Sequence, residues 1–219
     1  VRSRRQRQMC IRDRYIVAVT MEKMRKAGRP RSFNPDEALH RALVVFWEHG
    51  YEGASMALLQ EATGLTAPQI YRAFESKERL FERAVRLYQE QYGFGVRTDL
   101  PLVDAIGDYL ERAADEFTRE PGRGCLVSTG MLATGKDAET AAEIVRAERE
   151  HALNNLHDRI AHAVERGELT SDTDVTGVAR TIGALLQGMS VQARDGADRR
   201  ELTRIADSAR TLLSTLARP

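Results

Sequence analysis

Residues 55–74 read SMALLQEATGLTAPQIYRAF, and this stretch decides the fold. It contains two short runs of apolar residues at helical spacing, separated at Gly64. Ser55 and Thr66 are suited to cap the two helix N-termini, and Pro68 suits a first helical turn. Because glycine can adopt the backbone conformation that a sharp turn needs, the stretch predicts a helix-turn-helix.

The second helix of this motif is expected to project outward with its N-terminal residues leading. Thr66, Ala67 and Gln69 are small or able to hydrogen-bond, which suits a helix end that enters the DNA major groove. Ala67 can touch a thymine methyl group, and Gln69 can bond adenine or a phosphate. Tyr71 and Phe74 have a second interpretation as core aromatics, which we favour for Phe74.

Outward from this motif, amphipathic helices fill the chain, and no convincing alternation of strand residues appears. The prediction is therefore an all-α fold. An N-terminal three-helix domain with the helix-turn-helix is expected at residues 28–76, and a larger helical domain at residues 77–219. About nine helices are expected, near residues 35–49, 55–63, 66–74, 76–93, 102–119, 125–133, 138–166, 174–194 and 199–217.

The basic residues concentrate at one end of the chain. Residues 1–31 hold eleven Lys or Arg and two acidic residues, whereas the rest holds 22 basic and 30 acidic residues. We interpret residues 1–27 as a basic extension, either a solvated tail or an arm that neutralises nucleic-acid phosphates. The opening VRSRRQRQMCIRDR also resembles adapter-derived sequence at the ends of gene fragments, so we expect a native start at Met21 or Met24.

Cysteine usage and hydropathy favour the cytoplasm. Cys10 and Cys125 lie far apart in different surroundings, which is typical of a reducing compartment and argues against a disulfide. No apolar run approaches the roughly 18 residues of a membrane span, so no membrane partner is expected. The basic opening is not followed by the apolar region of a signal peptide.

Three motifs then make a family resemblance specific. They are FWEHGYEGAS at residues 46–55, ATGLT at 62–66 and IYRAFESKERL at 70–80. Together they resemble the DNA-binding region of the TetR/AcrR family of bacterial regulators over about fifty residues. Residues 102–217 resemble the family in helical layout and in the GCLV segment at 124–127.

The resemblance implies a set of DNA contacts and a function. We expect a ligand-responsive regulator, most often a repressor in this family, that a small-molecule effector releases from a palindromic operator in double-stranded DNA. Lys77 would meet a phosphate at a helix start. Ala67-Pro68 departs from the commonest family pattern, which bears on base preference. The residues implied to face DNA are Ser55, Thr66, Gln69, Tyr71 and Arg72, with Arg29 and Arg31 reaching the flanking minor groove.

One recognition helix reads few base pairs, so a two-fold homodimer is expected. The last two helices are the predicted interface, with packing inside one subunit as the alternative. Their small and apolar residues are Gly183, Ala184, Leu185, Leu186, Gly188, Met189, Leu212 and Leu216.

The resemblance also implies that a ligand between the central helices shifts the fourth helix and changes the separation of the two DNA-reading heads. Arg149 can bind an anionic ligand group or form an internal ion pair, which we favour. Aromatic and sulfur-bearing side chains can line the ligand cavity or serve as ordinary core, namely Tyr88, Tyr92, Phe94, Tyr109, Phe117, Cys125 and Met131.

Enzyme and cofactor signatures fail. Residues 130–137, GMLATGKD, nearly fit a phosphate-binding loop, but Asp137 lacks the hydroxyl that would ligate magnesium. The histidines of the long helix, His151, His157 and His162, do not have metal-binding spacing and are expected to be solvated. We predict no catalytic residue, no metal and no cofactor. The rival hypotheses are a nucleotide-binding enzyme and a purely structural helical protein.

Overall fold

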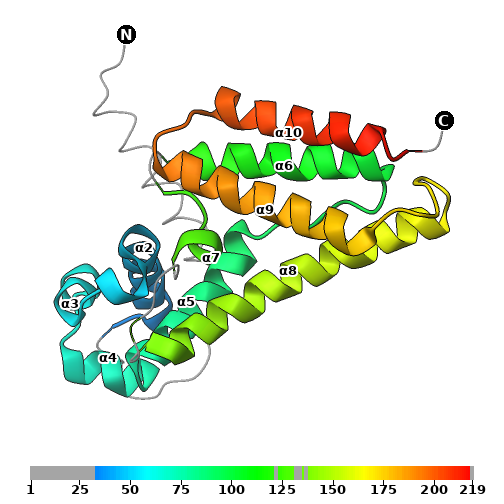
Figure 1. The fold of residues 1–219 in the computed structure, drawn as a ribbon. Coiled ribbons are helices and arrows are strands. Elements are labelled where there is room, and N and C mark those ends of the chain that lie inside the picture. Colours follow the sequence, from blue (N-terminus) through cyan, green and yellow to red (C-terminus); the bar gives the residue numbers. More distant parts are fainter. Residues whose placement is uncertain (1–32, 121–122, 131–134, 136–137, 218–219) are drawn as a thin grey trace, which may run out of the picture. The chain divides into compact units, whose positions relative to one another are not determined.

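The computed structural model describes residues 33–120, 123–130, 135 and 138–217. The chain divides into two units, Val1–Asn34 and Pro35–Pro219, and the fold below is that of the second. Its described part contains nine α-helices and no strand, so the all-α prediction is confirmed (Figure 1). The helices are α2 Pro35–Gly53, α3 Met56–Thr63, α4 Ala67–Phe74, α5 Lys77–Tyr92, α6 Leu102–Thr118, α7 Leu126–Thr129, α8 Glu139–Glu165, α9 Val175–Arg194 and α10 Arg199–Ser214.

Helix α2 breaks where the sequence predicts its end. Gly50 has a φ of 68°, outside the helical region, but one further helical turn follows to Gly53. The ring of Tyr51 in that turn lies 6.2 Å from Phe46 and 5.1 Å from Phe81. Aromatic packing therefore holds the extra turn against the core, which the sequence pattern did not show.

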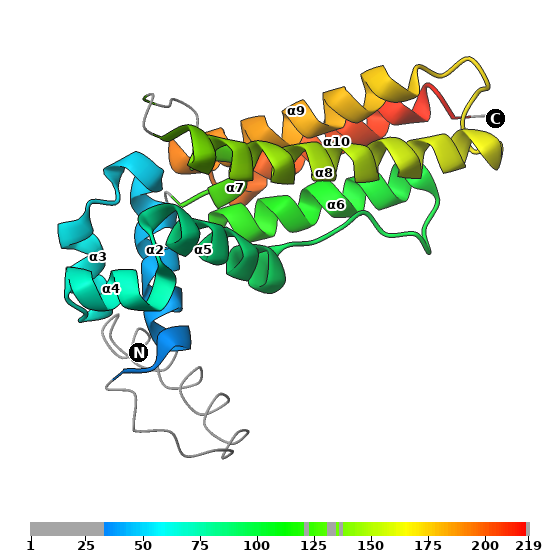
Figure 2. The same ribbon diagram turned by 90° about the horizontal axis from the view of Figure 1, so that it is seen from below.

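The long helices pack side by side, as Figures 1 and 2 show. Helix α6 packs against α10 and α9, and α8 packs against α9. Helix α10 ends at Ser214 rather than near residue 217 because the chain beyond it pairs with another segment. The amide of Thr170 donates to the carbonyl of Leu216, and Leu169 and Ala217 form an isolated bridge.

Helix α5 connects the helix-turn-helix to the rest of the unit. It contacts α2, α4, α7 and α8, and its contacts with α2 run from Phe81 to Tyr92. Its buried face consists of Leu80, Phe81, Ala84, Val85 and Tyr88. None of the described helices is both long and apolar enough to cross a membrane.

Candidate nucleic-acid interface and pocket

Two caps and one turn fix the helix-turn-helix, as the sequence predicts. The hydroxyl of Ser55 accepts the amide of Leu58 at 3.2 Å and starts α3. Gly64 ends α3 with a φ of 71°, a left-handed conformation that favours glycine. The buried Leu65 then anchors the turn to the core.

A glutamine that the sequence did not single out joins the two helices. The side-chain oxygen of Gln60 in α3 accepts the amide of Ala67, the first residue of α4, at 3.1 Å. Its side-chain nitrogen donates to the carbonyl of Met56 at 3.2 Å. This pair of bonds satisfies an otherwise open amide at the start of α4 and helps to set the angle between the helices.

Gln69 is a helix-capping residue as well as a predicted DNA contact. Its side-chain oxygen accepts both the amide and the hydroxyl of Thr66, each at 2.9 Å. A bidentate contact with adenine needs this oxygen as an acceptor. In this geometry Gln69 therefore offers only its amide NH2 group, which can donate to a base or to a phosphate.

Five of the predicted DNA-facing residues lie on α4 or at its N-cap. We call Thr66, Ala67, Gln69, Tyr71 and Arg72 the α4 surface. Thr66, Tyr71 and Arg72 are exposed, with Tyr71 at 46%, whereas Ala67 and Gln69 are half-buried.

The remaining residues of this region divide between core, solvent and undescribed chain. Phe74 is 1% exposed and anchors α4, which confirms its core interpretation. Ser55 is exposed at the start of α3. Arg29 and Arg31 lie outside the described residues.

The side chain of Lys77, the first residue of α5, is half-buried and not fully solvated. Its ammonium group lies 4.4 Å from the centre of the Tyr51 ring, and burial lowers its pKa. The hydroxyl of Tyr51 donates to Glu78 at 2.7 Å. Lys77 thus has a protein partner in place, and a phosphate would be a second one.

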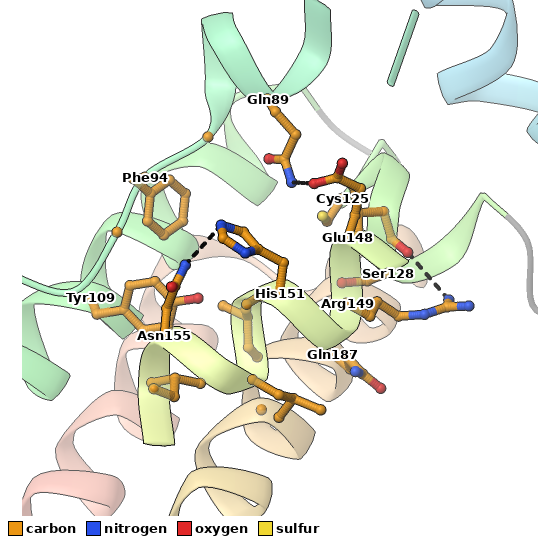
Figure 3. A pocket seen from close by; sticks show the side chains of 18 of the residues that line it. Gln89, Phe94, Tyr109, Cys125, Ser128, Glu148, Arg149, His151, Asn155 and Gln187 are labelled. Carbon is orange, nitrogen blue, oxygen red and sulfur yellow. Dashed lines mark hydrogen bonds between the residues drawn. The ribbon is translucent and has the colours of Figure 1, made fainter. Parts of the chain in front are cut away.

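The aromatic and sulfur-bearing residues predicted to line a cavity come together around one. It has a volume of about 380 Å³ and is bounded by α5 to α9 and the segment 93–96 (Figure 3). Tyr88, Tyr92, Phe94, Tyr109, Phe117, Cys125 and Arg149 all line it, whereas Met131 lies outside the described residues. The sequence missed its polar members, for which no motif exists, namely Gln89, Ser128, Glu148, His151, Asn155 and Gln187.

Two tyrosines of the cavity are held neutral. Burial, and next the electrostatic interaction with Cys125, raises the pKa of Tyr88 well above its usual value. Burial also raises the pKa of Tyr109 to about 12. Both phenols therefore keep their protons at neutral pH.

Arg149 does not form the ion pair that we favoured. It has no carboxylate partner among the described residues, and it donates to the carbonyl of Val127 at 3.3 Å. Figure 3 shows its guanidinium group on the side away from Phe94 and Tyr109. The adjacent Glu148 instead accepts from Gln89 at 3.1 Å, because its side chain reaches α5.

The cavity wall is bonded directly to helix α2. The indole nitrogen of Trp47 donates to the carbonyl of Gly124 at 2.9 Å, next to the cavity residue Cys125. The Trp47 ring lies 4.8 Å from Tyr88 and 4.9 Å from Tyr92. Trp47 is 4% exposed, which confirms its prediction as a core residue, and it connects α2 with the residues that line the cavity.

Helix α9 makes a second bond to the same helix. Arg194 donates to the carbonyls of Trp47 at 3.3 Å and Glu48 at 3.4 Å. These carbonyls lie at the break at Gly50, where the α2 hydrogen-bond ladder ends. Arg194 therefore caps the first part of α2 from another element.

Only part of the predicted dimer face is open. Met189 is fully buried in its own subunit, and a Cβ on Gly183 would lie 2.5 Å from the Leu153 side chain. These two residues pack within their own subunit, which was the alternative to a dimer contact. Leu212, at 60% exposed, and the neighbouring Val191, at 40%, are open, as is the space beside Gly188.

The near-phosphate loop is described only at Gly130 and Gly135. The amide of Gly135 donates to Glu52 at 2.7 Å, and the carbonyl of Gly130 accepts from Tyr51 at 3.3 Å. Both glycines thus bond to α2. The three histidines of α8 are exposed, as predicted, and His151 also lines the cavity. No cluster of three or more metal-ligating side chains occurs among the residues that the structure describes.

Comparison with known proteins identifies the family. A family model described as "Bacterial regulatory proteins, tetR family" matches residues 38–84, and one described as "Tetracyclin repressor-like, C-terminal domain" matches residues 102–209. The chain is also 32% identical over 197 residues to the HTH-type transcriptional repressor ComR of Escherichia coli (strain K12), covering 87% of this chain and 94% of ComR. The chain belongs to the TetR family. It is a transcriptional regulator of this family, and the predicted resemblance is confirmed.

Further relatives agree with this assignment. The HTH-type transcriptional repressor BdcR of Escherichia coli (strain K12) is 27% identical over 205 residues, covering 90% of this chain and 98% of BdcR. Among solved structures, a cysteine mutant of the TetR family regulator CifR, complexed with 26-bp double-strand operator DNA, superimposes with a TM-score of 0.79. It is 35% identical, covering 84% of this chain and 98% of CifR.

Proposed function

We propose that this TetR-family regulator is a homodimeric repressor that binds a palindromic operator and leaves it when a small molecule occupies the cavity. The α4 surface supports the DNA part of this proposal: Thr66, Tyr71 and Arg72 are exposed, and the buried Ile70 and Phe74 anchor the same helix. Each subunit would place α4 in one major groove. The similar regulator CifR is complexed with double-strand operator DNA.

The division of labour follows the helices. We assign DNA reading to residues 28–76 and effector binding and dimerisation to residues 77–219, with Arg29 and Arg31 as arm contacts and Lys77 as a phosphate contact. The effector would occupy the cavity of about 380 Å³, which is within the range of about 300–1,000 Å³ typical of small-molecule sites. Tyr88, Tyr92, Tyr109, Phe117, Cys125 and Met131 are the proposed effector contacts.

This assignment includes no enzymatic activity and no cofactor. Bacterial operators lie in the cytoplasm, so we place the regulator there. The relatives ComR and BdcR are named as transcriptional repressors, which supports repression as the sign of regulation.

The experiment is selection of bound duplexes from a randomised DNA library by the full chain, followed by affinity measurement. A two-fold symmetric selected site is the expected result. Arg72→Ala should weaken binding of that duplex at least tenfold, because one base or phosphate contact contributes about 1–3 kcal/mol. Arg119→Ala, which removes a 62%-exposed arginine at the end of α6, is the matched control and should leave affinity unchanged. Failure to select any duplex would refute the proposal.

A further inference from the structure

The deep part of the cavity carries no charge among the residues that the structure describes. The lining residues that are buried are all uncharged, and they include Tyr88, Tyr109, Phe117, Cys125, Ser128 and Leu156. A ligand carboxylate or ammonium group placed among them would lose its water without gaining a charged partner. The deep end therefore disfavours ions of either sign.

The charged lining residues lie nearer to solvent and are already engaged. Glu148 accepts from Gln89 at 3.1 Å, Arg149 donates to the carbonyl of Val127 at 3.3 Å, and His151 bonds Asn155 at 3.2 Å. Glu148 and Arg149, the two charged ones, are half-buried, and His151 is exposed. Glu148 and Arg149 also carry opposite charges, so the more exposed part of the lining favours neither an anionic nor a cationic ligand.

Two hydroxyl groups in the cavity have no hydrogen-bond partner within the described chain. Tyr109 from α6 is 5% exposed and Ser128 from α7 is 6% exposed, and both line the cavity. Neither oxygen is among the fully enclosed atoms without a partner, so each retains access to the cavity space. A buried hydroxyl without a partner is unfavourable, and a ligand oxygen would remove that cost.

The rest of the lining is rich in aromatic rings. Five of the thirteen aromatic residues of the chain line this one cavity. Ring-to-ring contacts add stabilisation beyond that of the buried area alone. The volume of about 380 Å³ lies at the small end of the range for ligand sites, which suits one or two rings better than a long acyl chain.

Resting on the proposed effector site, we infer that its ligand is an uncharged compound of one or two aromatic rings with a carbonyl or hydroxyl oxygen that hydrogen-bonds Tyr109 or Ser128. The rings contact the aromatic walls, and the oxygen reaches the deep end. A neutral tyrosine and serine can donate to a carbonyl or accept from a hydroxyl, so both oxygen types fit.

The test uses three probes with one ring skeleton: 2-acetylnaphthalene, 2-naphthoate and naphthalene, titrated into the full chain by calorimetry. The ketone should bind, and 2-naphthoate should bind at least 30-fold more weakly at neutral pH. At least one of Tyr109→Phe and Ser128→Ala should weaken binding of the ketone about two- to tenfold, the effect of one lost hydrogen bond. Both variants should leave naphthalene affinity unchanged, which a general loss of structure would not. Ser208→Ala, on the exposed side of α10, is the control and should change neither probe.

The outcomes separate this inference from the proposed function. Tighter binding of 2-naphthoate than of the ketone would overturn the inference, and so would equal losses for ketone and naphthalene in the two variants. If no probe binds while the chain still binds its selected duplex, the inference is wrong and the repressor proposal stands. If the ketone binds as described but no duplex is selected, the ligand class stands and the repressor proposal fails.

Discussion

Single residues in the helix-turn-helix serve stability and recognition at once. Gln69 is the clearest example, because its oxygen caps α4 and leaves its NH2 group as the donor for the proposed DNA contact. The sequence predicted the DNA role of Gln69 but not its use as a cap. The two functions can be separated by substitutions that change one end of the amide.

Gln69→Glu should keep the fold and abolish recognition. The carboxylate still accepts from Thr66, and its negative charge is favourable at a helix N-terminus by about 0.3–1 kcal/mol. Operator affinity should fall at least 100-fold, because the donor is lost and the new charge faces phosphates. Gln69→Ala, by contrast, should weaken both affinity and stability, the latter by about 0.5–2 kcal/mol. Denaturant unfolding and duplex titration of both variants test this, and equal stability losses would contradict it.

Glu75 occupies a strained position directly after α4. Its φ of 72° and ψ of −54° place a non-glycine residue in a tight turn in which the amide of Ser76 donates to the carbonyl of Phe74. Such a conformation costs about 1–3 kcal/mol. Glu75→Gly should therefore raise the free energy of unfolding by about 1 kcal/mol after the entropic cost of glycine. Glu75→Ala removes the same carboxylate but keeps the Cβ, so thermal unfolding should show no gain for it.

At the scale of elements, the main feature that the spacing of apolar residues did not reveal is the set of hydrogen bonds that tie α2 to its neighbours. Trp47 donates to the carbonyl of Gly124, and Arg194 donates to the carbonyls of Trp47 and Glu48. We call these bonds the α2 joint. Caps at Ser55 and Thr66 and the turn at Gly64 were predictable, because each depends on neighbours within a few residues. Arg159 shows the opposite case: it is 6% exposed and donates to the carbonyls of Arg97 and Leu100, some sixty residues away. No periodicity signals such a contact, since it depends on how the helices pack.

The same limit explains the cavity. Its aromatic walls, Tyr109 included, were predictable because they follow helical stripes. The Ser128 hydroxyl was not, because Ser128 lies in a four-residue helix with no sequence signature of its own. The ion pair expected for Arg149 failed for a related reason. Neighbours in sequence point in different directions from a helix, so Glu148 reaches α5 and Arg149 does not.

Arg194→Met should remove the hydrogen bonds from α9 to α2 and keep the apolar part of the side chain at residue 194. The carbonyls of Trp47 and Glu48 would lose their charged donor, and the long distances of these bonds put the expected loss at about 1 kcal/mol of unfolding free energy. The operator affinity of the effector-free and effector-bound forms should also become more alike. Arg180→Met, at an exposed position of the same helix, is the control. An unchanged ratio of the two affinities would show that α5 alone transmits the signal.

At the scale of the whole molecule, the open parts of α9 and α10 are the dimer face that we propose. Leu212 is 60% exposed in the single subunit, so Leu212→Arg should not disturb the subunit fold. In a dimer the same charge would be buried between helices, where an unpaired charge is very costly. Sedimentation should show the dimer dissociation constant rising at least 100-fold, and operator affinity should fall with it. Thr98→Arg, in the exposed α5–α6 connection, should remain dimeric. A dimer of unchanged strength in Leu212→Arg would move the interface elsewhere.

The position of Trp47 also gives the molecule its own optical reporter. It is the only tryptophan of the chain, so indole fluorescence comes from one place. That indole packs against Tyr88 and Tyr92, which line the cavity, and donates to the carbonyl of Gly124, next to the cavity residue Cys125. Occupation of the cavity by a non-fluorescent compound should change the emission intensity or wavelength, and Trp47→Phe should abolish the signal. The fluorescence of Trp47 can thus report ligand binding in the cavity and its effect on α2, in real time and without labelling.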